Sequence, residues 1–229
     1  MGLARNNIMM LLALCLASCF LSSHETTSYY PLEKGNYWIY EGESEEQMGH
    51  DIYKTKQLWK IEVLDVFPRG HITGYAIRKT ITDIKSGKVD VLREGIVRVG
   101  PNAYYSLDIN KFDRLKNKKD ILYDLLSSDD IILDMPLVVG KRFGDPEQLT
   151  RDDGYYCYVV MGDNQIKLNN VKGIESGKHY HSYDLRYYTL PGESTETFVP
   201  GIGYVSYRYS HHGSVSEYNM RLIEFHKNN

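Results

Sequence analysis

From Asn36 to Phe225, short runs rich in β-branched and aromatic residues alternate with turns of Gly, Pro, Asn and Asp. In residues 72–82, for example, Tyr75 and Ile77 would lie on one face of an extended chain, with polar residues on the other. This two-residue period is typical of a half-buried strand, and the turn residues between runs favour hairpins. The sequence therefore predicts an all-β fold, mainly antiparallel, built as a meander of hairpins.

One segment departs from the strand pattern. Within residues 118–128, apolar residues recur at the spacing of a helix: Ile121, Leu122, Leu125 and Leu126. We predict one short amphipathic helix there, because this spacing gathers the side chains on one face. That face would cover a sheet edge or the mouth of a barrel, or would dock a partner.

The beginning of the chain has the layout of a signal peptide. Arg5 gives a basic start, residues 8–17 form an apolar run, and small residues precede Cys19. The apolar run is about half as long as the ~20 residues that a membrane-spanning helix needs, which disfavours a permanent span. We therefore expect residues 1–18 to be a signal peptide that ends at Ser18.

The tetrad Leu16-Ala17-Ser18-Cys19 resembles the lipobox of bacterial lipoproteins. The resemblance implies that Cys19 carries diacylglycerol and a further acyl chain such as palmitate, and that it anchors the protein to a membrane. The alternative is an ordinary cleaved signal followed by a chance cysteine. Phe20 stands where an aspartate would resemble an inner-membrane retention signal of enteric bacteria, so the outer membrane is favoured if the host has one.

After the signal peptide, residues 19–28, which are polar after the apolar Phe20 and Leu21, suit a short lipidated tether, and residues 29–229 suit one β-rich domain. Two similar phrases occur in this domain, Pro31-Leu32-Glu33-Lys34-Gly35-Asn36-Tyr37-Trp38 and Pro136-Leu137-Val138-Val139-Gly140-Lys141-Arg142-Phe143. They would arise from an internal duplication with halves that meet near residues 110–135, or by chance in a protein rich in turns.

Both phrases, together with Phe198-Val199-Pro200-Gly201-Ile202-Gly203-Tyr204-Val205, resemble a group of uncharacterised bacterial envelope lipoproteins. In that group, YPLxxGNxWxY opens the domain, LPLxxGKxW recurs midway, and PGVGxV leads into the last hairpin. Phe143 stands here where tryptophan is usual, which keeps an aromatic residue for packing. The resemblance implies a curved antiparallel sheet or a partly open β-barrel, and it brings no established activity and no catalytic residue.

His179 and His181 are the first candidates for metal ligands. Their spacing puts both imidazoles on one face of a strand, but no HExxH sequence and no cysteine pair accompanies them. We expect exposed histidines without a metal, and a metal-dependent hydrolase only if a third ligand joins them. Cys157 lies in an apolar run and is expected to be a small buried residue rather than a nucleophile.

The composition narrows the choice of partners. The chain has 27 Lys and Arg against 30 Asp and Glu and no dense basic cluster, which argues against nucleic acid. No glycine-rich phosphate cradle is present, so no cofactor is expected. The 20 tyrosines suit a sheet with one wet face, and exposed tyrosines could contact sugars or proteins. We expect a non-enzymatic envelope lipoprotein whose β-domain binds an apolar ligand, a glycan or an envelope protein, or supports an assembly.

Overall fold

The computed structural model describes residues 29–122 and 124–228, so the predicted signal peptide, Cys19 and the tether lie outside the described residues. The described chain is dominated by strands, which confirms the all-β class. In chain order, the strands are β1 (Tyr37–Met48), β2 (Asp51–Arg69), β3 (Ile72–Asp83), β4 (Val89–Val99), β5 (Ala103–Asp108), β6 (Ile131–Asp134), β7 (Arg142–Gly144), β8 (Cys157–Lys167), β9 (His179–Tyr188), β10 (Gly192–Val199), β11 (Gly203–His211) and β12 (Ser216–His226).

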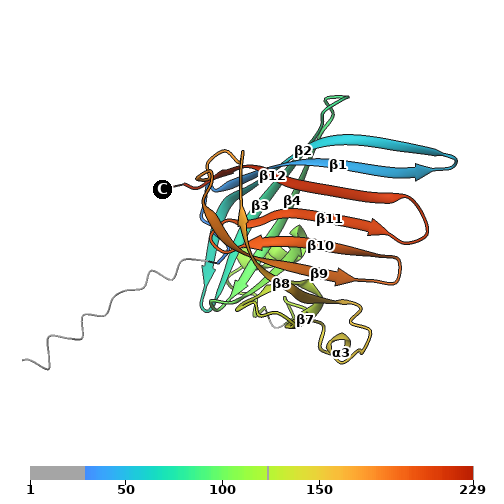
Figure 1. Ribbon diagram of the computed structural model, residues 1–229. Coiled ribbons are helices and arrows are strands. Elements are labelled where there is room, and N and C mark those ends of the chain that lie inside the picture. Colours follow the sequence, from blue (N-terminus) through green and yellow to red (C-terminus); the bar gives the residue numbers. More distant parts are fainter. Residues whose placement is uncertain (1–28, 123, 229) are drawn as a thin grey trace, which may run out of the picture.

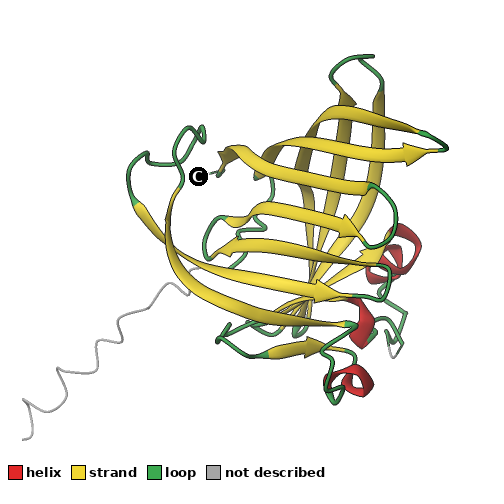
Figure 2. Cartoon of the chain, turned by 45° about the vertical axis from the view of Figure 1, so that its right-hand side comes forward, coloured by secondary structure: helices red, strands yellow, loops and turns green. Residues whose placement is uncertain are grey.

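All these strands belong to one antiparallel sheet of 12 strands. From β1 to β6 and from β7 to β12 each strand pairs with its neighbours in the chain, and β1 also pairs with β12. The order therefore runs from β6 through β1 and β12 to β7, and the sheet curls round on itself (Figures 1 and 2). The seam between β6 and β7 is not closed by strand pairing, so the fold is the partly open barrel that the family resemblance implied. The origin of the two meanders by internal duplication stays a prediction.

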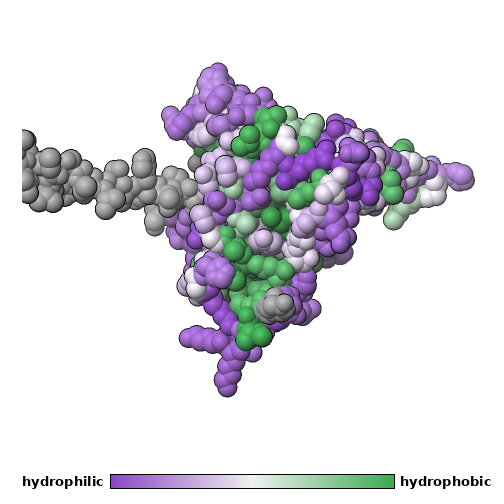
Figure 3. Space-filling model, turned by 90° about the horizontal axis from the view of Figure 1, so that it is seen from below, coloured by the Kyte–Doolittle hydropathy of each residue, from purple (hydrophilic) through white to green (hydrophobic). Residues whose placement is uncertain are grey.

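The two strands at the seam are the shortest of the sheet, with 4 residues in β6 and 3 in β7. Short edges offer few unpaired backbone groups to another chain. The hydroxyl of Tyr204 in β11 donates a hydrogen bond to the carbonyl of Ile132 in β6 at 2.7 Å, which ties this edge to a distant strand. Seen from below, apolar side chains form a band between hydrophilic flanks (Figure 3).

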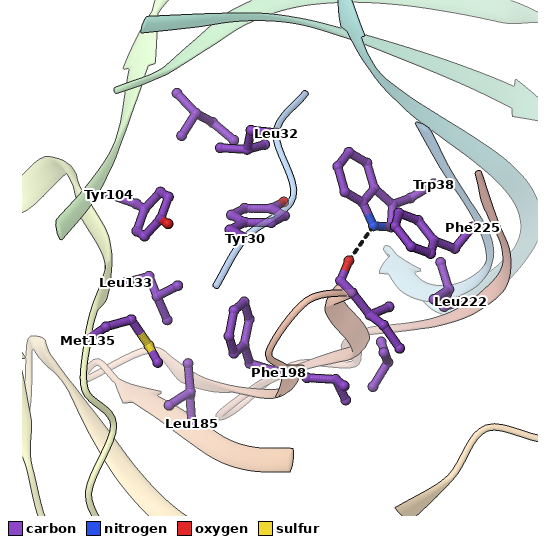
Figure 4. Close-up of a cluster of buried hydrophobic side chains, with 14 of the residues drawn as sticks. Tyr30, Leu32, Trp38, Tyr104, Leu133, Met135, Leu185, Phe198, Leu222 and Phe225 are labelled. Atoms are coloured by element: carbon purple, nitrogen blue, oxygen red, sulfur yellow. Dashed lines mark hydrogen bonds between the residues drawn. The ribbon is translucent and has the colours of Figure 1, made fainter. Parts of the chain in front are cut away.

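The main core fills the inside of the barrel. Trp38, Tyr104 and Phe198 are buried there (Figure 4). Tyr75 and Ile77 are also buried in this core, on the face that their spacing predicts. Burying large aromatic and aliphatic side chains stabilises a domain by roughly 1.5–3 kcal/mol per side chain before entropy is counted. The interior is thus a packed core over much of its length rather than an open channel.

A second, smaller core lies under the short helix α2 (Ile109–Asp113). Asp108 caps this helix, because its carboxylate accepts hydrogen bonds from the amides of Asn110 and Lys111. Phe112 packs directly against Gly95 of β4, where a Cβ atom would lie only 1.8 Å from the Phe112 ring. The missing side chain of Gly95 therefore makes room for α2 on the sheet. Another short helix, α3 (Pro146–Leu149), follows β7.

The fold does contain a short helix, as predicted, but the position predicted for it, within residues 118–128, is wrong. The described residues of this segment before Ser128 form turns and irregular structure, and Leu122 has a φ of 56°, which a right-handed helix does not allow. The Arg69 guanidinium donates hydrogen bonds to backbone carbonyls of Asn117 and Lys118, so side-chain donors satisfy carbonyls at the start of this segment. Leu125 is buried in the second core, which explains part of the apolar spacing without a helix.

Among the described residues, no helix combines the length and the apolar character that crossing a bilayer requires.

Candidate functional site

The chain segment before β1 enters the barrel and plugs part of it. The Tyr30 ring is buried and lies 5.6 Å from Trp38, 6.0 Å from Tyr104 and 5.8 Å from Tyr204 between ring centroids (Figure 4). Leu32 from the same segment is also buried in this core. We call Tyr30 and Leu32 the N-terminal plug. It leaves room for a cavity in the interior beside it.

This cavity, the candidate site, has a volume of about 200 Å³. A buried water needs on the order of 10–15 Å³ in the same measure, so a ligand of roughly 15 non-hydrogen atoms would fit. The lining combines apolar side chains, phenol hydroxyls and three charged groups. Its apolar part includes Ile61, Ile96 and Met220, its tyrosines include Tyr40, Tyr158, Tyr204 and Tyr207, and its charged residues are Lys79, Glu94 and Glu196.

Glu196 is placed in the cavity by the register of β10. Its neighbours across the strand pairs are Tyr207 in β11 and Leu185 in β9, and Leu185 is buried. Side chains two residues apart share a face, and Phe198 on that face is fully buried in the core. Burial raises the pKa of Glu196 to about 7, although a hydrogen bond from the Tyr158 hydroxyl partly opposes this shift. At neutral pH this carboxyl group is therefore charged for a smaller part of the time than a glutamate exposed to water.

The other two charges of the cavity neutralise each other. Lys79 in β3 and Glu94 in β4 form an ion pair at 2.6 Å, and both side chains are about one quarter exposed. Both residues line the cavity together with Glu196. Two carboxyl groups and one ammonium group leave an excess of one carboxyl group.

The tyrosines of the lining are held in place by neighbouring groups. The Tyr40 hydroxyl donates a hydrogen bond of 2.9 Å to the backbone carbonyl of Tyr204, and the Tyr158 ring stacks on Phe143 at 5.0 Å between centroids. Burial raises the pKa of Tyr158 and Tyr204 well above the ordinary value, so both phenols keep their protons. The cavity wall is thus rich in aromatic rings whose phenols stay protonated and can donate hydrogen bonds.

The predicted candidates lie elsewhere. His179 and His181 are exposed on β9, where His181 contacts the carboxylate of Asp163 and lies against the Tyr183 ring. In the part of the chain that the structure describes, no group of three His, Cys, Asp or Glu side chains could hold a metal ion. The hypothesis of a hydrolase built on this histidine pair therefore gains no third ligand among the described residues.

Cys157 is fully buried, as its apolar surroundings predict, and burial raises the pKa of its thiol. It does not line the cavity. The charged cavity-lining residue that sequence reasoning missed is Glu196. The sequence does contain a signal for it. Ser194, Glu196 and Phe198 are two residues apart, so a carboxylate falls on the same face of the strand as a core aromatic residue.

No protein-family model and no curated protein matches this sequence. Among solved structures, the fold is similar to that of a Bacteroides fragilis NCTC 9343 protein described as exported and as having a YmcC-like fold. The TM-score is 0.52 at 11% identity, over 87% of this chain and 99% of that one. A Parabacteroides distasonis ATCC 8503 chain described as a lipoprotein matches over the same shares, with a TM-score of 0.49 and 10% identity.

Proposed function

We propose that this protein is a cell-envelope lipoprotein whose β-domain binds a small ligand inside the barrel without catalysing a reaction. The observation that carries the proposal is the cavity beside the N-terminal plug. It joins an apolar surface from Ile61, Ile96 and Met220 to a few polar groups, a combination typical of ligand-binding pockets. An apolar or amphipathic small molecule suits it better than a protein or a long glycan, because the space is small and internal.

The proposed location in the cell envelope rests on the N-terminal sequence. Lipid chains on Cys19 would anchor the protein firmly, and the ten residues 19–28 would keep the β-domain within ~35 Å of the bilayer. The Bacteroides fragilis protein of similar fold is described as exported, which agrees with this address. Phe20 after the cysteine favours the outer membrane in a host that has one.

A binding role has more support than catalysis. The hydrolase hypothesis needs His179 and His181 to meet a third ligand in a concave site, and among the described residues they do not. The cavity, in contrast, brings together polar and apolar groups from β2, β4, β8, β10 and β11.

A neutral amphipathic probe tests this proposal. We expect 1-octanol to bind the Cys19→Ser form, which carries no lipid, in a saturable manner detectable by NMR. Ser106 lines the cavity, so Ser106→Phe should fill it and abolish binding. The matched control is Ser176→Phe at an exposed position, which should leave binding unchanged. Equal binding to both variants, or no saturable binding to the parent protein, would overturn the proposal.

A further inference from the structure

The charges of the cavity point to the chemical class of its ligand. Lys79 is already paired with Glu94 at 2.6 Å, so the described residues of the lining leave no unpaired cation in the cavity. In the described part of the chain, no Lys, Arg or His forms an ion pair with Glu196, and its polar neighbour is the Tyr158 hydroxyl. Buried carboxylates in proteins are ordinarily paired with a cation, because an unpaired buried charge is costly. The missing partner would have to come from outside the chain.

The surroundings of Glu196 are aromatic on more than one side. Tyr207 lies directly opposite it in β11, Tyr158 contacts it from β8, and Tyr204 lines the same cavity. The face of a tyrosine ring attracts cations through its quadrupole, by about 0.5–1 kcal/mol in exposed sites and more in dry ones. A carboxylate surrounded by tyrosines is therefore well suited to an ammonium group.

We propose that the ligand carries an organic ammonium group, held beside Glu196 among Tyr158 and Tyr207, and an apolar body that contacts Ile61, Ile96 and Met220. This inference rests on the proposed function, since it names the ligand class of the same cavity. An anionic ligand would bring a like charge towards Glu196 and Glu94, and Lys79, the only cation among the described residues of the lining, is already engaged. A neutral ligand would leave the excess carboxyl group without a cationic partner.

Binding of an ammonium ligand should release a proton from Glu196, and this release distinguishes the ligand class experimentally. Burial raises the pKa of Glu196 to about 7, so part of the carboxyl population is protonated at neutral pH. The other titratable groups that face it are Tyr158, Tyr204, Tyr207 and Tyr30, with the Lys79–Glu94 pair on the same lining. Burial raises the pKa of all four phenols above the ordinary value, so they stay neutral. A bound cation would lower the pKa of Glu196 and expel its proton.

The experiment compares n-octylammonium with 1-octanol and octanoate, which share one chain length and differ in charge. We expect octylammonium to bind the full-length Cys19→Ser protein at pH 7 more tightly than the other two by roughly tenfold or more. Calorimetry in buffers of different ionisation enthalpy should show proton release on binding. Glycerophosphoethanolamine, a lipid headgroup small enough for the cavity, is a further arm, and the tighter of the two amines separates a lipid headgroup from a free amine.

Glu196→Gln removes the charge with little change of shape and is the decisive variant. It should weaken octylammonium binding roughly tenfold or more and abolish proton release, while 1-octanol binding stays as it was. Glu46→Gln, the same change at an exposed position of β1, should alter neither. Octylammonium binding equal to that of 1-octanol, or unchanged in Glu196→Gln, would overturn the inference and leave the binding function standing. Absence of 1-octanol binding would instead remove the proposed function itself.

Discussion

Trp38 Nε1 donates a hydrogen bond of 2.6 Å to the backbone carbonyl of Ile202. This contact joins the phrase that opens β1 to the Pro-Gly turn between β10 and β11, which is 164 residues away in the chain. Gly203, next to Ile202, has a φ of 107°, and a Cβ atom there would lie 2.8 Å from the Tyr30 ring. Two of the short phrases noticed in the sequence thus meet in the core and hold the N-terminal plug in place.

Trp38→Phe should destabilise the protein strongly. The substitution leaves the buried carbonyl of Ile202 without its indole donor and removes part of a fully buried ring. We expect a loss of about 2–4 kcal/mol in the free energy of unfolding, measured by urea denaturation. Trp59→Phe is the matched control, because Trp59 is only partly buried and donates to the side chain of Gln57. A loss for Trp38→Phe no larger than for the control would contradict this role.

Gly95→Ala tests how α2 packs on the sheet. The new methyl group would meet the Phe112 ring at 1.8 Å, so α2 must shift, and we expect a loss of about 1–3 kcal/mol or more. Phe112→Leu removes much of the clash, and Gly95→Ala should therefore cost less in that background. Urea denaturation of the two single variants and the double variant measures this coupling. Additive losses would show that Gly95 does not act through Phe112.

The strands were predictable because their signal is local. Tyr75 and Ile77 stand two residues apart in one strand, and both are buried as that period predicts. The misplaced helix has a different origin. Leu125 is buried while Ile121 is 86% exposed, so the apolar spacing of that segment records contacts with a distant core rather than one face of a helix.

The candidate site was not predictable to the same extent. Glu196 meets Tyr207 and Leu185 only through strand register, and Tyr158 reaches it from a strand that is not adjacent to β10. Register across several hairpins depends on bulges such as the one between Thr197 and Phe198, which local propensity does not encode. The sequence could predict that Glu196 faces the core, but it could not predict which residues contact it.

Cys19→Ser tests the predicted lipid anchor. If lipid on Cys19 holds the protein, the parent should partition with membranes, and the variant should be released into the aqueous fraction. Intact-mass spectrometry should show a mass on the parent that corresponds to acyl chains and is absent from the variant. Cys157→Ser, a change of the buried thiol, should keep the lipid mass if the protein folds. Equal membrane partitioning and no mass difference between the parent and Cys19→Ser would refute the lipoprotein assignment.

The pH dependence of stability should reveal the half-buried carboxyl group of Glu196. Burial raises its pKa to about 7 in the folded protein, whereas the unfolded chain has the ordinary value of 4.5. The folded state therefore binds more protons than the unfolded state between these two values, and stability contributed by this group falls as pH rises through that window. The contribution is fully present below the lower value and lost above the upper one. Its size is on the order of 3 kcal/mol.

Glu196→Gln should remove this dependence. We expect the variant to gain stability relative to the parent as pH rises from about 4.5 to about 7, and the difference to level off above that range. Urea denaturation across this range measures it, with Glu46→Gln as the exposed control. Asp120 and Asp153 do not interfere, because hydrogen bonds from Arg114 and Arg151 lower their pKa to about 2, so their contributions change at more acidic pH. A constant difference between parent and Glu196→Gln would mean that water, rather than the protein interior, surrounds this carboxylate.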